Sequence, residues 1–313
     1  MQRRHLLGRL AVTTAALTAL ATGLVACGGD DKPTGEASPD TAAQFPVTVG
    51  DTTVAAKPSK IVSLSATGTE MLYAIGAGTQ ITAVDSTSNF PAEAPTKAEL
   101  TAMDATAESV AAFAPDLVVL YFDPGNVAEG LKALNIPVYL TPAAATIDDA
   151  YTQLSDLGRL TGHTGEAETV VGQMKADIAE IVAGAPKSAK PVSYYWESDD
   201  SYYSLTSSTF VGSLLGQVGM ESIADPADPD GKAFGYPQLS LEHIFASDPA
   251  MIVLADTKCC GQTAETVAAR DGWDSLTAVK EGRVVALDDD IASRWGPRVV
   301  DLLRQVVAGL PAA

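Results

Sequence analysis

The apolar residues of this chain fall into short continuous runs, and each run is followed by a polar loop and a helical pattern. Short, unbroken apolar runs are typical of parallel strands that are buried on both faces. The strands predicted in this way are residues 60–64, 81–84, 138–140, 191–196 and 284–287. The helices predicted from 3.6-residue periodicity and capping residues are 71–76, 210–216 and 297–309. Strand, loop and helix in this order predict an α/β protein.

A fourteen-residue pattern occurs twice, at 107–120 and at 241–254. In each copy an acid, Glu108 or Glu242, opens a short helical pattern, a proline follows seven residues later, and an apolar strand ends the unit. A helix that leads into a buried strand is the unit of a parallel sheet. The repeat therefore predicts two similar α/β lobes, which we place at residues 45–146 and 187–313.

Residues 147–186 join the two lobes. Up to residue 182 this segment has helical periodicity, an apolar face and no proline, so it predicts a long lobe-linking helix. Gly162 and Gly165 are the points at which this helix would break or kink.

The first 26 residues have the layout of a bacterial lipoprotein signal peptide. Arg3, Arg4 and Arg9 precede an apolar stretch that is too short to span a bilayer and that ends at Cys27. Cys27 is therefore the predicted lipidation site, and it would anchor an extracytoplasmic protein to the cell membrane. The paired arginines also fit a twin-arginine signal, so the export route stays open. Residues 27–44 have a polar, small-residue composition and are predicted to be a flexible tether.

Charge and cysteine content narrow the possible partners. The net charge is −19, and removal of the arginine-containing leader makes it more negative, which argues against nucleic acid or anionic lipid as a direct partner. Apart from Cys27, the chain has only the adjacent Cys259 and Cys260. In an exported protein they could form a vicinal disulfide, although such a ring is strained, or they could simply belong to a surface loop.

The sequence offers little for catalysis or for a bound metal. It has no nucleophile elbow, no phosphate-binding glycine loop and no serine–histidine–aspartate set in a plausible context. Direct capture of a bare metal ion would need about three converging ligands, whereas the mature chain has only His163 and His243. We therefore expect no catalytic residue, no metal site and no cofactor. An exported α/β enzyme remains the less favoured alternative.

Several short motifs resemble the helical-backbone metal-receptor family, the substrate-binding lipoproteins of ABC importers for iron-siderophores, haem and cobalamin. The resemblance covers nearly the whole mature chain and rests on the order and spacing of residues 60–65, 69–70, 89–91, 115–118, 236–242, 282–284 and 293–298. It implies a class III periplasmic binding protein: a monomer with two Rossmann-like lobes, each with a mostly parallel sheet, joined by one long helix. It also implies a permease and an ATPase as partners, and a metal chelate as ligand.

Residues that directly follow the predicted strands are the candidates for binding this ligand, because α/β sheets bind ligands beyond the carboxyl ends of their strands. Aromatic walls would contact a large flat chelate, and Arg294 would pair with a carboxylate or phosphate in a fork. Cobalamin binders of the family have a tryptophan where this chain has Ala102 followed by Met103, so we expect an Fe(III) chelate, with cobalamin and haem as alternatives. The candidate ligand-binding residues are Ser65, Thr67, Tyr121, Phe122, Trp196, Tyr236, Arg294 and Trp295.

Glu108 and Glu242 occupy the same position in the two repeats. In the family that the chain resembles, an acid at this position on each lobe docks to arginines of the permease. Two like charges related by pseudo-symmetry suit a two-fold symmetric partner. The alternative is that each acid is simply favoured by the dipole of its helix.

Overall fold

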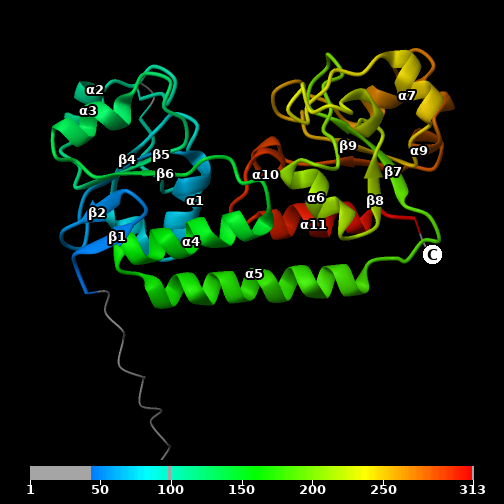
Figure 1. Ribbon diagram of the computed structural model, residues 1–313. Helices are drawn as coiled ribbons and strands as arrows, with labels where there is room; N and C mark the ends of the chain where they lie inside the picture. The colour runs from blue at the N-terminus through cyan, green and yellow to red at the C-terminus, as the bar shows by residue number, and fades with distance from the viewer. Residues whose placement is uncertain (1–43, 98–99, 312–313) are drawn as a thin grey trace, which may run out of the picture. The chain divides into compact units, whose positions relative to one another are not determined.

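The computed structural model describes residues 44–97 and 100–311 of the chain (Figure 1). The predicted signal peptide, Cys27 and the tether as far as residue 43 lie outside the described residues. All the described residues belong to one compact unit. No helix in the described ranges is both long and apolar enough to cross a membrane.

The first lobe is built on a parallel sheet with the strand order β4-β3-β5-β6. Its strands are β3 (Ile61–Leu64), β4 (Ile81–Val84), β5 (Leu117–Leu120) and β6 (Val138–Leu140). One face packs on α2 (Ala107–Ala111) and α3 (Val127–Ala133), and the other on α1 (Ala66–Ala74) and α4 (Ile147–Thr161). A small antiparallel hairpin, β1 (Val47–Val49) and β2 (Thr52–Val54), and a 3-10 turn (Ala77–Gln80) complete this lobe.

The second lobe repeats this topology with the order β8-β7-β9-β10. Its strands are β7 (Val192–Glu197), β8 (Met220–Ser222), β9 (Met251–Leu254) and β10 (Val284–Ala286). Its helices are α6 (Phe210–Gly216), α7 (Leu241–Ser247), α8 (Ala264–Ala268), α9 (Thr277–Lys280), α10 (Asp289–Ser293) and α11 (Val299–Ala308), with 3-10 turns at Asp225–Ala227 and Trp273–Ser275. The repeated units α2–β5 and α7–β9 occupy matching places, which confirms the two predicted lobes.

The segment between the lobes forms two helices, α4 and α5 (Thr164–Gly184), so a single helix over residues 147–186 is wrong. The break is at Gly162, whose φ of 74° is in the left-handed region that suits glycine, while Gly165 lies inside α5. Figure 1 shows α4 and α5 side by side, with α5 leading toward β7. The linking helix is therefore α5 alone.

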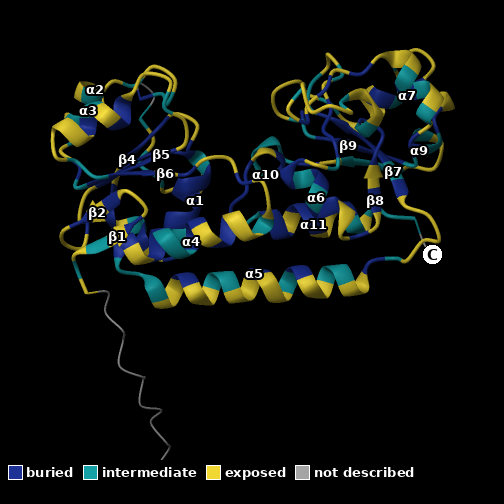
Figure 2. Cartoon of the chain, viewed as in Figure 1, coloured by how far each residue is buried: buried dark blue, intermediate teal, exposed yellow. Residues whose placement is uncertain are grey.

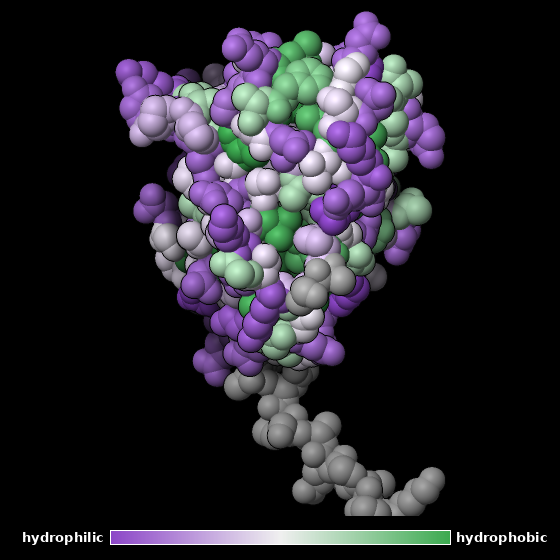
Figure 3. Space-filling view, turned by 90° about the vertical axis from the view of Figure 1, so that its right-hand side faces the viewer, coloured by the Kyte–Doolittle hydropathy of each residue, from purple (hydrophilic) through white to green (hydrophobic). Residues whose placement is uncertain are grey.

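One hydrophobic cluster runs through both lobes. It joins Met71 of α1 and Leu154 of α4 to Met174 of α5, and continues to Leu214 of α6 and Leu302 of α11. Figure 2 shows this as a buried layer between the sheets and α5, whose outer face is exposed. The end of this unit that the second lobe forms is largely hydrophilic, with apolar residues in small groups (Figure 3). The shared core means that the lobes are held by packing as well as by the connecting chain.

Candidate functional site

Two adjoining cavities lie at the carboxyl ends of the strands, where the sequence predicted a ligand site. Their volumes are about 270 and 360 Å³, and both are lined by Tyr121, Ser293, Arg294 and Trp295. The first cavity also has Trp196 and Tyr236 in its wall, together with Phe210 and Leu205. The second is lined in addition by Ser65, Thr67, Met103 and Phe122. The structure thus brings all eight predicted ligand-binding residues to one cleft with walls from both lobes.

Aromatic side chains form much of this cleft. The ring of Tyr121 lies 5.5 Å from that of Trp295 and 6.3 Å from that of Phe122. Tyr121, Phe122 and Tyr236 are about half exposed, so their rings are available to a ligand. Tyr121 of the first lobe and Tyr236 of the second line the same cavity. Burial, and next the nearby Tyr121 phenol, raise the pKa of Tyr236.

The two tryptophans are more deeply set than the tyrosines. Trp196 is 2% exposed and Trp295 is 9% exposed. The Nε1 of Trp295 donates a hydrogen bond of 2.8 Å to Oε1 of Gln153 on α4. This bond fixes the orientation of the Trp295 ring, against which Tyr121 packs.

Ser65 and Thr67 line the second cavity at the start of α1. Ser65 is the N-cap of this helix: its hydroxyl accepts from the Gly68 N–H at 3.0 Å and from the Thr141 hydroxyl at 3.0 Å. Both Ser65 and Thr67 are almost fully buried. The position of Ser65 agrees with the prediction, but its hydroxyl is occupied in holding the helix and β6 together.

Arg294 departs from the role expected of it. Its Nη1 donates to Oε1 of Glu70 at 2.7 Å, and its Nη2 donates to Oδ1 of Asp290 at 2.6 Å. Nη2 also lies 3.0 Å from the carbonyl oxygen of Thr87 and 3.0 Å from Oδ1 of Asn89. Because both terminal nitrogens already have acceptors, the guanidinium offers no free fork to an anionic ligand. The expected fork is corrected to a structural contact at the cleft wall.

Sequence reasoning missed the partner of this arginine, Glu70 of α1. Glu70 is 3% exposed, and it also accepts from Nε of Arg298 at 2.9 Å and from its Nη2 at 2.5 Å. The Arg298 guanidinium lies 4.1 Å from the centroid of the Phe90 ring. One buried carboxylate thus binds two arginines that come from the other end of the chain.

A second buried ionic group lies at the carboxyl ends of β7 and β9. Glu197 is fully buried and receives both terminal nitrogens of Arg270, at 2.7 and 2.5 Å. Asp256 is also fully buried, and neither of its carboxylate oxygens has a hydrogen-bond partner. Burial, reinforced by the adjacent Glu197 carboxylate, raises the pKa of Asp256 to about 7. We conclude that Asp256 is a buried acid that retains its proton well above the usual range.

The two predicted docking acids are exposed at the starts of matching helices. Glu108 lies in the first turn of α2, which Thr106 caps, and Glu242 lies in the first turn of α7, which Ser240 caps. Hydrogen bonds at the helix start, to its own backbone N–H and to Thr106, lower the pKa of Glu108. Both side chains point to solvent, where a partner could reach them.

The described cysteines and histidines are not among the residues that line the cleft. Cys259 and Cys260 carry free, exposed thiols, so the vicinal disulfide that the sequence allowed is not formed in the structure. Nε2 of His243 lies 2.6 Å from the carbonyl oxygen of Ile223, and His163 is the N-cap of α5. Within residues 44–97 and 100–311, no group of three or more His, Cys, Asp or Glu side chains is placed to hold a metal ion.

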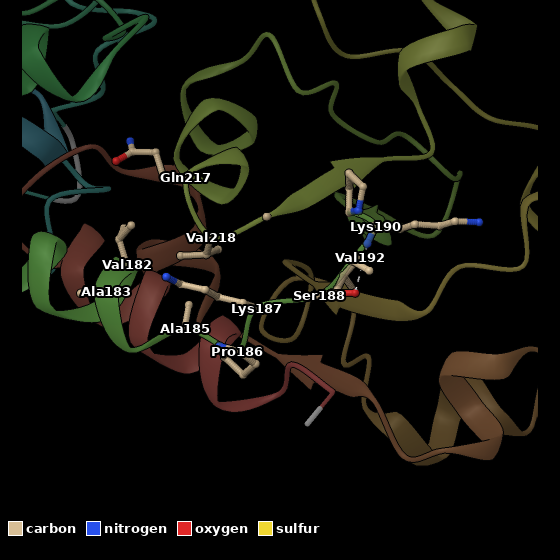
Figure 4. Close-up of a pocket in the computed structure, with 13 residues that line it drawn as sticks. Val182, Ala183, Ala185, Pro186, Lys187, Ser188, Lys190, Val192, Gln217 and Val218 are labelled. Atoms are coloured by element: carbon tan, nitrogen blue, oxygen red, sulfur yellow. Dashed lines mark hydrogen bonds between the residues drawn. The ribbon is translucent and has the colours of Figure 1, made fainter. Parts of the chain in front are cut away.

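A third cavity, of about 560 Å³, lies where α5 leads into β7 (Figure 4). Its wall includes Val192, the first residue of β7, so it lies at the opposite end of that strand from Trp196. Figure 4 shows Lys187 and Lys190 pointing in different directions rather than converging on one point. It therefore lacks the position and the convergent polar groups of a ligand site in this type of fold.

Two similar α/β lobes with an aromatic cleft at their strand ends define a solute-binding protein. The chain matches the family model described as periplasmic binding protein over residues 61–291, and it belongs to this family. An uncharacterized ABC transporter substrate-binding lipoprotein of Bacillus subtilis, YvrC, is 28% identical over 309 residues, which is 95% of each chain. A vitamin B12-binding protein of Pectobacterium carotovorum is 26% identical over 82% of this chain and 90% of its own.

Among solved structures, a possible iron-binding, periplasmic solute-binding protein of Staphylococcus epidermidis superposes with a TM-score of 0.68 at 25% identity. The match covers 81% of this chain and 99% of that protein. The family assignment confirms the expected fold class, and it identifies the chain as an extracytoplasmic substrate-binding protein of the ABC importer type rather than an enzyme.

The buried acid Asp256 predicts a specific dependence of stability on pH. An unfolded chain releases this proton near pH 3.8, whereas the folded protein retains it to about pH 7. The folded state therefore binds more protons in this window, and its stability falls as the pH rises from about 4 to about 7. Between these pH values the wild type should lose free energy of unfolding on the order of 2–4 kcal/mol, and Asp256→Asn should abolish this loss. Denaturant unfolding from pH 4.5 to 7.5 measures this.

Asp274→Asn, at an exposed acid of the same lobe, is the matched control and should keep the wild-type slope. Equal slopes for the wild type and Asp256→Asn would show that Asp256 titrates normally.

Proposed function

We propose that this substrate-binding protein captures an iron-siderophore-type metal chelate and delivers it to the permease and ATPase of an ABC importer. The observation that carries the proposal is the cleft between the lobes, where the half-exposed rings of Tyr121, Phe122 and Tyr236 surround space for a flat or bulky apolar ligand. Such rings provide large contact areas without requiring a bare metal ion.

Cobalamin is the second candidate, since one relative over most of the chain is named a vitamin B12-binding protein. Against it stands the wall at residues 102 and 103, because the resemblance to the family aligns Ala102, which Met103 follows, with the tryptophan of cobalamin binders. Both residues line the second cavity, so the difference bears directly on ligand contact. Haem, a flat iron chelate, is a further alternative.

The ligand is tested by fluorescence titration of the purified protein with ferric hydroxamate, catecholate and citrate chelates, haem and cobalamin. Trp196 and Trp295 line the first cavity, so a ferric chelate should quench their emission. Tyr121→Ala and Tyr236→Ala should each weaken binding by about 1–3 kcal/mol, because each removes a ring from the wall. Tyr203→Ala, an exposed aromatic residue outside both cavities, is the control. Tight binding of cobalamin alone would reverse the ranking, and binding of none would reject the proposed ligand class.

We further propose that Glu108 and Glu242 dock the loaded protein onto the permease. They occupy the same place in the two lobes, and both are exposed away from the cleft lining. Charge reversal of both to Lys should abolish uptake while ligand affinity stays within about twofold, because surface charges act mainly on encounter.

Glu265→Lys separates docking from a simple helix-dipole role. Glu265 is also an exposed acid in the first turn of a short capped helix, and its pKa is lowered by the same kinds of hydrogen bond as that of Glu108. This variant should transport normally. If it loses uptake as the double reversal does, or if the double reversal weakens ligand binding in the folded protein, docking is rejected.

We also propose that the protein is anchored through a lipid on Cys27. The support is the run of apolar and small residues that ends at Cys27, and the lipoprotein name of the Bacillus subtilis relative. Cys27→Ala should release the protein from membranes and abolish incorporation of labelled fatty acid. The control, Cys259→Ala with Cys260→Ala, should stay anchored and labelled. Unlabelled wild-type protein, or a Cys27→Ala variant that stays fully with membranes, would contradict the anchor.

A further inference from the structure

We infer that the cleft selects metal chelates that carry no net negative charge. This inference rests on the proposed function and narrows it to one class of chelate. It reverses the expectation that an anionic group of the ligand would pair with Arg294. The argument depends on which charged side chains reach the cleft and on how each is already compensated.

Among the residues that the structure describes, the charged ones that line the two cavities are Asp85, Asp290 and Arg294. The single cation, Arg294, is 9% exposed, and its terminal nitrogens donate to Glu70 and Asp290. Within residues 44–97 and 100–311, no residue that lines either cavity is a lysine or a histidine. An anionic ligand would therefore find no uncompensated positive side chain in these walls.

The charged side chains in and around the cavity walls carry a net negative charge. Asp85 is 1% exposed and is held by hydrogen bonds from the backbone of Thr87 and Ser88 and from the Thr87 hydroxyl, without a cation. Asp288 and Asp290 share Lys258, at 2.8 and 2.7 Å. The network as a whole therefore has a surplus of two negative charges. Its carboxylates are those of Glu70, Asp85, Asp288, Asp289 and Asp290, and its cations are Lys258, Arg294 and Arg298.

The positive contributions that remain are the start of α1, which borders the second cavity, and the start of α6, whose first residues Phe210 and Val211 line the first cavity. A helix N-terminus is equivalent to about half a positive charge at most. One first-turn donor of each helix is already bound, the N–H of Gly68 to the hydroxyl of Ser65 and the N–H of Gly212 to the hydroxyl of Thr209. Two such half charges cannot offset a surplus of two carboxylates, so the local field opposes an anion.

This field separates chelates by their charge. A ferric ion bound by three hydroxamates is neutral, whereas three catecholates leave a trianion, and ferric citrate and haem carry free carboxylates. Moving an anion from water toward a partly buried group of side chains with a net negative charge is unfavourable, and a neutral complex escapes this cost. The cleft therefore favours a neutral or cationic chelate, such as a ferric trihydroxamate.

The test compares two ferric chelates of similar size, a linear trihydroxamate and a tris-catecholate, by calorimetric titration. The trihydroxamate should bind at least about tenfold more tightly, and lowering the salt concentration should weaken only the catecholate. Equal or tighter binding of the catecholate would overturn the charge inference while supporting the proposed function. If neither chelate binds, nor haem or cobalamin, the proposed function itself fails.

A pair of variants at Ser293 tests the cause. Ser293 is exposed and lines both cavities, and its hydroxyl bonds only to the carbonyl oxygen of Asp289. Ser293→Lys adds the missing cation, so it should improve the ratio of catecholate to trihydroxamate affinity by about tenfold. Ser293→Gln, of similar length but uncharged, should leave the ratio unchanged. The same ratio in both folded variants would show that charge does not set the preference.

Discussion

The buried carboxylate of Glu70 is the contact on which the arrangement of the cleft depends. It accepts hydrogen bonds from Arg294 and Arg298, which lie on either side of the turn between α10 and α11. Removal of one partner of such a buried group typically costs about 3–5 kcal/mol, because the other charge is left without compensation. The turn between the two arginines carries Trp295, against which Tyr121 packs. The position of the aromatic wall therefore follows from an ion pair whose carboxylate, Glu70, is not among the residues that line the two cavities.

This contact acts together with the shared core. The cluster that runs from α1 and α4 through α5 to α6 and α11 fills the space beneath both sheets. The network of Glu70 then joins the first lobe to the segment that leads into α11, at the side where the cavities lie. The shared core and the Glu70 ion pairs both constrain the junction between the two lobes. The spacing between the walls of the cleft is therefore set by the fold before a ligand arrives.

The sequence predicted those features that depend on local periodicity. Strands such as β4 and β6 and the helix α6 agree with their predicted bounds, and the repeat of 107–120 at 241–254 reproduces α2–β5 and α7–β9. The break at Gly162 was foreseen only as one of two options, because a glycine within a helical pattern does not by itself show that the chain reverses there. The rule that ligands bind at the carboxyl ends of strands selected candidate residues that line one cleft in the structure.

The same rule could not predict what each side chain would do. Arg294 and Glu70 are 224 residues apart, and no pattern in the sequence indicates that they meet. A free arginine and a compensated one look identical in a sequence, although their effects on an anionic ligand are opposite. Glu197 and Asp256 were more accessible to inference: Glu197 is the last residue of β7, Asp256 lies just beyond β9, and these two strands are paired, so two acids at neighbouring strand ends were a usable signal.

The acidic residues of the chain are also concentrated in particular places. In an α/β unit the helix runs antiparallel to the strand that follows it, so the first turns of α2 and α7 lie toward the same sheet edges as the carboxyl ends of β5 and β9. The proposed docking acids and the acidic network of the cleft thus belong to one edge of each lobe. A field of this sign would attract a cationic partner to that edge, and at the same time it would repel anionic solutes from the cleft. A single distribution of charge can therefore serve both the choice of chelate and its delivery.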